Sequence, residues 1–220
     1  MIVPETGLAD VVAAVDATRD ITRRRGKQTV IWWVGADQED LAEGLAALGI
    51  ANRDTPGFEA TENCMALVEP PPPGQSPGVE ARALASKDEF AESGELVWEV
   101  FGHSEEERER SRALLDEDWE IYSRPDNPGC SFVAFVDGRM VGVGFAAGAD
   151  AGVNLFGGAV LPEARNRGVY RALVDARWRF AVERGTPALT IQAGRMSRPI
   201  VERLGFRFLG AGRIFVDELS

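Results

Sequence analysis

The segment of the chain best suited to chemistry lies between residues 157 and 171. An apolar run gives way there to a short basic loop and then to a helical pattern. The first N–H groups of a helix have no partner inside it and carry the positive end of its dipole. Gly168 lets a phosphate approach that backbone, and Arg165, Arg167 and Arg171 add cations to an acidic chain. The spacing predicts a pyrophosphate site, and the alternative is an ordinary strand–helix loop with solvated arginines.

Two periodic elements hold this loop. The apolar run Val153–Val160 predicts a strand, and Gly168–Arg184 predicts a helix whose apolar residues recur with the 3.6-residue period. Gly185 is expected to end that helix. The other elements expected in the C-terminal part are strands at Val79–Ala85, Ser131–Val136, Met140–Ala146 and Ala188–Gln192, helices at Lys87–Phe101, Ser104–Ser123 and Ser197–Leu204, and a final pair of strands within Phe206–Val216. This order predicts a mixed α/β or α+β layout with helices packed on one sheet.

A run of four prolines divides the chain. Because proline cannot donate a ladder hydrogen bond and favours extended backbone, we expect a linker at residues 71–78. It separates an N-terminal part, residues 1–70, from a C-terminal domain, residues 79–220. Aligned without gaps, Ala13–Trp32 and Ala172–Ile191 agree at six of twenty positions, and each predicts a helix, a glycine and then a strand. This similarity favours a partial internal repeat, with shared amphipathic composition as the alternative.

The N-terminal copy differs from the C-terminal one where the basic loop should be. The matching residues are Thr6–Val11, which include an acidic side chain and no basic one. We therefore expect this part to bind no phosphate. Trp32 and Trp33 are adjacent on its expected strand, so they face opposite sides, which predicts that both faces of the strand are covered.

Composition excludes several classes of protein. The chain has 220 residues, a net charge of -11 and a pI near 4.7, which argues against nucleic-acid binding and against anionic membranes. Two cysteines and one histidine are too few for a disulfide scaffold or a structural zinc site. With no visible signal peptide or apolar span, we expect a cytoplasmic protein with free thiols and no metal.

The basic loop resembles a known family. Arg165, Gly168 and Tyr170 occupy the key positions of the signature loop of the GNAT superfamily of acyl-CoA-dependent N-acyltransferases, which reads Gln or Arg, two residues, Gly, one residue, then Gly or Ala. Glu202–Phe206 is similar to that family's last helix and its Leu-Gly-Phe end. The resemblance covers residues 79–218. It implies an α+β fold, with a mixed, mostly antiparallel sheet and helices on both faces, to which the partial N-terminal repeat is added.

The resemblance also implies the roles of individual residues. Backbone amides of the loop would hold the pyrophosphate of acetyl-CoA, and the strand end would pair with the pantetheine arm and offer an amide to the oxyanion. The cofactor-binding residues implied are Gly158, Ala159, Val160, Arg165, Asn166, Arg167, Gly168, Val169, Tyr170 and Arg171.

Three positions depart from the family pattern. The last Gly or Ala of the signature is Tyr170, the family's usual acid, a tyrosine, falls on Val201, and an asparagine often found earlier falls on Gly194. The catalytic residues are therefore unknown. The remaining candidates are Ser197, Tyr122 and Asn154, for which a helix N-cap is the alternative at Ser197 and helix-end packing at Tyr122.

The function expected from this resemblance is N-acetylation. The acceptor would be a primary amine of a small molecule, which would attack acetyl-CoA directly in a monomer or homodimer. The alternative is a CoA-binding or acyl-CoA-binding module or sensor with little catalysis, which the missing tyrosine favours.

Overall fold

The computed structural model describes residues 10–24, 26–55, 57–74 and 76–219, which form two compact units. The first unit holds the described residues up to Cys64 together with Ala193–Arg198 and the chain from Phe208 onward. The second unit holds Met65–Gln192 and Pro199–Arg207. The chain therefore enters the first unit again after leaving it, and the predicted boundaries at residues 70 and 79 stay a prediction.

Five strands of the second unit form an ordered sheet. They are β4 (Val79–Ala83), β5 (Gly129–Val136), β6 (Arg139–Ala149), β7 (Gly152–Val160) and β8 (Leu189–Ala193), in the order β4-β5-β6-β7-β8. Neighbours are antiparallel except β7 and β8, which are parallel. Asp137 and Gly138 connect β5 and β6 with φ angles of 51° and 79°, the left-handed turn that the Asp-Gly pair predicts. The mostly antiparallel α+β sheet confirms the expected fold class.

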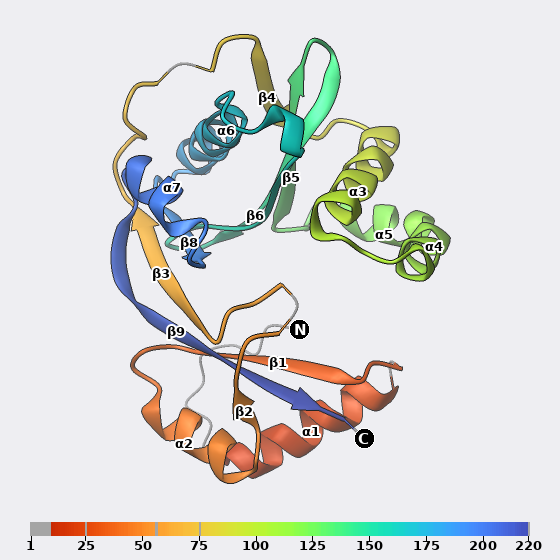
Figure 1. Cartoon of the computed structure of the whole chain (residues 1–220), viewed down its shortest axis with the longest axis vertical. Coiled ribbons are helices and arrows are strands. Elements are labelled where there is room, and N and C mark those ends of the chain that lie inside the picture. Colours follow the sequence, from red (N-terminus) through yellow and green to blue (C-terminus); the bar gives the residue numbers. More distant parts are fainter. Residues whose placement is uncertain (1–9, 25, 56, 75, 220) are drawn as a thin grey trace. The chain divides into compact units, whose positions relative to one another are not determined.

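Helices cover both faces of this sheet. α6 (Val169–Glu183) contacts β4, β5, β6 and β7, while α3 (Lys87–Phe101) contacts β6 and β7 from the opposite side (Figure 1). β5 is buried on both faces, since its consecutive residues Phe132, Val133 and Ala134 point alternately to the two faces and are all nearly inaccessible. The α6 face carries the loop that the sequence singled out.

Glycines let α6 lie directly on the sheet. A Cβ atom built on Gly142 would lie 2.7 Å from a methyl group of Val169, and one built on Gly144 would lie 2.8 Å from Nη1 of Arg177. Both distances are shorter than non-bonded atoms tolerate. Since successive side chains of a strand alternate between faces, these two positions of β6 share the α6 side. The glycines therefore set how closely the helix approaches the sheet.

Two short helices follow α3, where the sequence predicted one helix over Ser104–Ser123. α4 (Glu105–Ala113) and α5 (Leu115–Tyr122) are separated at Leu114, whose φ of −98° and ψ of 1° are not helical. A capping box formed by Ser104 and Glu107 begins α4 at the expected helix start. The predicted single helix is therefore two helices. No residue of α4 is buried, so packing does not hold the helix straight beyond Ala113.

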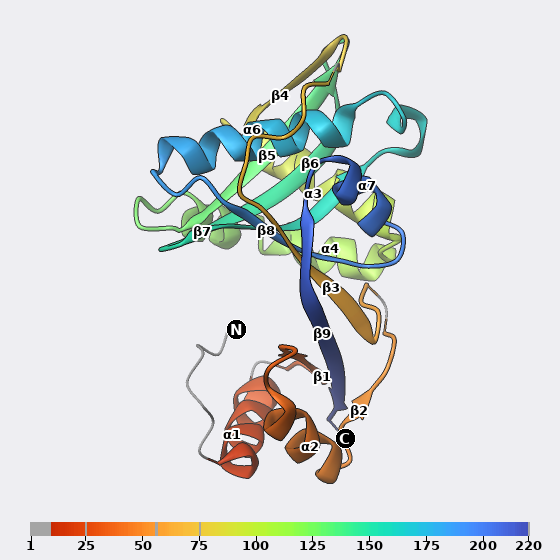
Figure 2. The same ribbon diagram turned by 90° about the vertical axis from the view of Figure 1, so that its left-hand side faces the viewer.

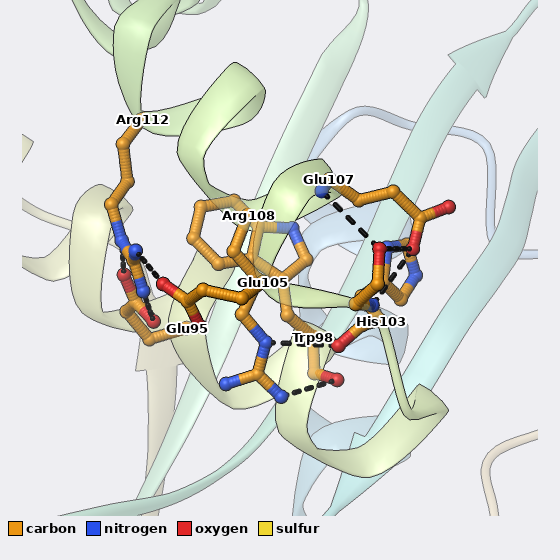
Figure 3. Close-up of polar contacts among 8 residues, drawn as sticks. Glu95, Trp98, His103, Glu105, Glu107, Arg108 and Arg112 are labelled. Carbon is orange, nitrogen blue, oxygen red and sulfur yellow. Dashed lines mark hydrogen bonds and ion pairs between the residues drawn. The ribbon is translucent and has the colours of Figure 1, made fainter.

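Ion pairs and caps fasten α4 to α3 (Figure 3). Arg112 of α4 binds Glu95 of α3 with both Nε and Nη2, and its guanidinium lies over the Trp98 ring at 5.6 Å. Arg108 donates to the backbone carbonyls of Trp98 and His103 at the C-terminal end of α3. Because these groups are largely exposed, we interpret them as fixing the angle of the helix pair more than its stability.

The first unit packs two helices against one face of a strand pair. α1 (Val11–Arg24) and α2 (Glu39–Ala47) enclose a core with β1 (Thr29–Val34), which pairs antiparallel with β9 (Arg207–Glu218). The short strand β2 (Ala51–Asn52) also pairs with β9. The core residues are Val15, Trp32, Val34, Ala42, Leu45, Ile50 and Phe215. Two further elements, β3 (Thr61–Leu67) and α7 (Arg198–Arg203), contribute residues to both units.

Two expectations about these elements were wrong. The predicted pair of strands within Phe206–Val216 is the single strand β9, because neither Gly210 nor Gly212 adopts the positive φ that a tight turn would need. Trp33 is 41% exposed and makes an edge-on ring contact to Phe58, so the described residues do not cover β1 on both faces. Trp32 on the other face is buried as expected.

The element order agrees with a partial repeat. α1, β1 and α2 follow one another as α6, β8 and α7 do. Gly26 and Gly185, which follow the first helix of each set, have φ angles of 65° and 76°. Residues 6–9 of the segment matched to the basic loop lie outside the described residues, so the absence of a phosphate site there stays a prediction.

We predict that Gly144→Ala destabilises the protein by about 1–3 kcal/mol, because the new methyl group would overlap the buried Arg177 guanidinium. Thermal or denaturant unfolding would measure this. Gly148→Ala is the matched control, since its methyl group would meet only the exposed and adaptable Arg184 guanidinium. Equal destabilisation by the two variants would contradict the close packing of α6 at Gly144.

Candidate functional site

The edge of β7 is free where the sequence predicted a ligand-binding strand end. β7 pairs with β8 only from Val153 to Leu155, whereas its pairing with β6 continues to Val160. The described part of β8 therefore leaves Phe156–Val160 with one unpaired edge. An unpaired strand edge presents N–H and C=O groups that an extended ligand can use. Three predicted residues, Gly158, Ala159 and Val160, lie on this segment.

A β-bulge opens within the free segment. Val143 pairs with Ala159 and Phe145 pairs with Phe156, so Gly157 and Gly158 together oppose Gly144. Gly157 has a φ of 57°, and a Cβ atom there would lie 2.4 Å from the Phe145 ring. The bulge therefore depends on glycine, and it redirects the backbone groups next to Gly158.

The loop after β7 forms the N-terminus of α6. A 3₁₀ turn at Pro162–Ala164 is followed by Asn166 and Gly168, whose φ angles of 63° and 82° are left-handed. Gly168 is the N-cap of α6, and none of the described side chains caps it. The first N–H groups of the helix are thus available to a ligand. Such a helix end, beside positive side chains, suits a phosphate.

The predicted arginines of the loop differ in how they are engaged. Arg165 and Arg167 are exposed, with Nε of Arg165 donating to the Val160 carbonyl at 3.4 Å and Nη2 of Arg167 lying 4.0 Å from Asp137. These weak contacts leave both side chains able to turn toward an anion. Val169 by contrast is buried, so it can contribute only its backbone.

The proline-rich segment lies against this helix end (Figure 2). Arg171 donates from Nη1 to the Pro72 carbonyl at 2.7 Å, and Ser76 donates to the Gly168 carbonyl at 3.0 Å. A Cβ atom on Gly74 would lie 2.5 Å from Nε of Arg171, so the segment approaches closely. The sequence predicted a linker here and gave no sign that it would contact the basic loop. One nitrogen of the Arg171 guanidinium is therefore already hydrogen-bonded to the proline-rich segment.

Tyr170 and Arg177 occupy the sheet side of α6. The Tyr170 ring lies over Gly158, where a built Cβ atom would be 3.0 Å from Cε2. Arg177 lies about two turns further along the helix, over Gly144, with Cζ 5.9 Å from the Tyr170 ring centre. Sequence reasoning missed Arg177, since it reads as one more charged residue of an amphipathic helix. The only available signal was its place on the apolar face, seven residues after Tyr170.

The catalytic candidates have structural partners. Asn154 lies within the paired part of β7 and accepts a hydrogen bond from Thr190 of β8 at 3.1 Å. The Tyr122 hydroxyl accepts the Ser131 N–H at 3.1 Å, while its ring packs on Phe90 and Trp119. Burial raises the pKa of Tyr122 above its ordinary value of 10.0, so its hydroxyl keeps its proton near neutral pH.

Ser197 belongs to the first unit. Its hydroxyl donates to the Gly194 carbonyl at 3.3 Å, and Glu59 accepts the neighbouring N–H of Arg195. Val201, at the position of the family's tyrosine, is fully buried.

The described residues form neither a metal-binding cluster nor a membrane-spanning helix. The described part of the chain holds no group of three or more His, Cys, Asp or Glu side chains arranged for a metal ion. Within the described ranges, no helix combines the length and the apolar character that crossing a membrane requires.

Comparison with known families identifies the class of protein. The sequence profile of the acetyltransferase (GNAT) family matches residues 92–206, more than half of the chain. The chain therefore belongs to this family. The match runs from within α3 to just beyond α7, and it includes the free edge of β7 and the α6 N-terminus. No curated protein matches the chain.

Solved structures share the fold over nearly the whole chain. A GCN5-related N-acetyltransferase from Kribbella flavida has 18% identity and a TM-score of 0.64, with 95% of this chain and 76% of that one covered. One from Sphaerobacter thermophilus has 20% identity and a TM-score of 0.64, with 98% and 69% covered. A tandem GNAT protein from the clavulanic acid biosynthesis pathway has 16% identity and a TM-score of 0.64, with 94% and 69% covered. At such identities the comparisons show the fold alone.

We predict that Tyr122→Phe lowers the stability of the protein by about 1 kcal/mol, because the buried Ser131 N–H loses its acceptor. Its turnover should fall less than about tenfold, well short of the roughly 10²–10⁴-fold effect of a true general acid. Thermal unfolding and thiol release from acetyl-CoA would measure the two effects. A thousandfold loss of turnover with an unchanged melting temperature would contradict the structural role and identify the acid.

Proposed function

We propose that this protein transfers an acetyl group from acetyl-CoA to a primary amine of a small molecule. One observation carries the proposal: the free edge of β7 leads directly into an uncapped helix N-terminus flanked by arginines. An extended arm that ends in a pyrophosphate fits this arrangement. The arm would pair with Gly158–Val160, and the phosphates would meet the amides of Asn166–Arg171.

The bulge supports a role in the transfer itself. An amide beside Gly158 would accept the negative charge that develops on the thioester oxygen. The amine lone pair forms the new C–N bond, the C–S bond breaks, and its electron pair leaves on the CoA sulfur. The surplus proton of the amine goes to solvent, and the thiolate takes a proton from solvent.

The acceptor and the compartment are part of the proposal. The α3–α5 segment is rich in Asp and Glu, so its field attracts a cationic amine. An amine must lose a proton before it attacks, and solvent can accept that proton.

We propose the cytosol as the compartment, since acetyl-CoA and free thiols such as Cys64 and Cys130 are compatible there.

A second candidate function is a CoA-binding module with little catalysis. It is favoured by the buried Val201 at the place of the family's proton donor, and by Tyr170 at the place of its last small residue. Incubation with acetyl-CoA, a panel of amines and a thiol reagent separates the two functions. Amine-dependent thiol release supports the transferase, and CoA binding without release on a broad panel supports the module.

We predict that Gly168→Asp weakens acetyl-CoA binding by about tenfold or more relative to Gly168→Asn, as measured by isothermal titration. The two side chains have similar size and both tolerate the left-handed backbone, so they differ chiefly in the charge placed at the phosphate site. Gly185→Asp, at the opposite end of α6 and also left-handed, is the control for charge elsewhere. Equal affinities of the Asp and Asn variants would contradict the assignment of the phosphate site.

A further inference from the structure

A buried arginine lacks an ionic partner on the sheet side of α6. Arg177 is 1% exposed, and within the described residues it takes part in no ion pair. Its Nε donates to the Leu173 carbonyl at 3.0 Å and its Nη1 to the Phe145 carbonyl at 3.4 Å. Its Nη2 has no hydrogen-bond partner in the described part of the chain. Burial lowers the pKa of this guanidinium, and only Tyr170 opposes that shift.

Such a side chain is costly for stability. Removing a cation from water without a compensating anion is unfavourable, and apolar residues of similar volume commonly replace buried ionic groups without loss of stability. Carbonyl oxygens offset only part of this cost. Packing alone therefore does not account for arginine at this position, and residues that break the rules of core packing and polar satisfaction are expected at functional sites.

The location of the Arg177 guanidinium supplies a functional reason for an arginine at this position. The guanidinium lies flat against Gly144, with Nη1, Cζ and Nη2 at 2.8, 3.0 and 3.3 Å from a built Cβ atom. Gly144 opposes the Gly157–Gly158 bulge, and adjacent strands are about 4.8 Å apart. Beside it, the Tyr170 ring covers Gly158 on the same side of the sheet. The Arg177 charge is thus about one strand spacing away from the bulge. Because Gly144, Gly157 and Gly158 have no side chains, none of them lies between the guanidinium and the bulge.

We infer that Arg177 stabilises the negative charge that develops on the thioester oxygen when it is bound at the Gly158 bulge. Tyr170 covers the bulge and keeps water from the guanidinium, so the charge acts through backbone in a medium of low dielectric constant. This inference rests on the proposed function and deepens it, since it assigns a charge-stabilising residue to a site that lacks the family's tyrosine.

Two CoA thioethers test the inference without turnover. S-carboxymethyl-CoA places a carboxylate one carbon beyond the position of the thioester carbonyl carbon, where the acetyl methyl group would lie, and S-ethyl-CoA is its neutral counterpart. Isothermal titration gives the ratio of their affinities for each form of the full-length protein. We expect Arg177→Met to lower the preference for the carboxylate by about tenfold or more relative to wild type. Arg177→Lys should keep most of the preference, because the charge is retained.

Two further variants complete the set. Arg179→Met removes an exposed arginine of the same helix and should leave the affinity ratio unchanged. Arg177→Gln is a second neutral variant, which keeps a hydrogen-bond donor for the Leu173 carbonyl in case the Met variant folds poorly. The melting temperature of Arg177→Met should equal or exceed that of wild type, whereas a purely structural guanidinium predicts a decrease.

The outcomes separate the inference from the proposed function. An unchanged affinity ratio in the neutral variants, with S-ethyl-CoA still bound, would overturn the role of Arg177 and leave the cofactor site in place. Failure of wild type to bind either thioether would overturn the proposed function and the inference with it. A tenfold loss of the ratio in both neutral variants, but not in Arg179→Met, would support the inference.

Discussion

The close contact between α6 and the glycines beneath it is the constraint on which the site depends. Gly142 and Gly144 of β6 and Gly158 of β7 have no side chains, so Val169, Arg177 and Tyr170 rest on the backbone of the sheet. A larger residue at these positions would push the helix outward. The same contact holds the N-terminus of α6 beside the end of β7, where the strand edge is free. Packing and binding geometry are therefore set by the same few residues.

Charge is distributed unevenly around this contact. The chain is acidic overall, yet Arg165, Arg167 and Arg171 lie at the N-terminal end of α6. Arg177 is buried on the side of the same helix that faces the sheet. A helix N-terminus adds to their positive field. The proline-rich segment is hydrogen-bonded to the N-terminal end of α6 through Arg171 and Ser76. It therefore lies beside the basic loop and does more than connect two parts of the chain. Affinity for a polyanionic cofactor would then depend on this segment as well.

Periodic elements of this fold could be predicted from the sequence, and interactions between distant segments could not. α3 was predicted with its bounds, because it has a clear apolar period and a clear stop at Gly102. The basic loop was recognisable from the spacing of Arg165 and Gly168. The break at Leu114 was missed because no proline or glycine marks it in the sequence. The unbroken course of β9 was missed because it depends on pairing with β1 and β2, which local sequence does not reveal. The contact of Arg177 with Gly144 likewise depends on tertiary structure. Helix propensity does not distinguish this arginine from its exposed neighbour Arg179.

A crystal structure of the protein with acetyl-CoA tests the central claim most directly. We expect the pyrophosphate within hydrogen-bond distance of the first amides of α6, and the thioester oxygen next to the Gly158 amide, with the pantetheine arm along the free edge of β7. Acetyl-CoA bound elsewhere on the chain, or phosphates remote from Gly168, would contradict the account.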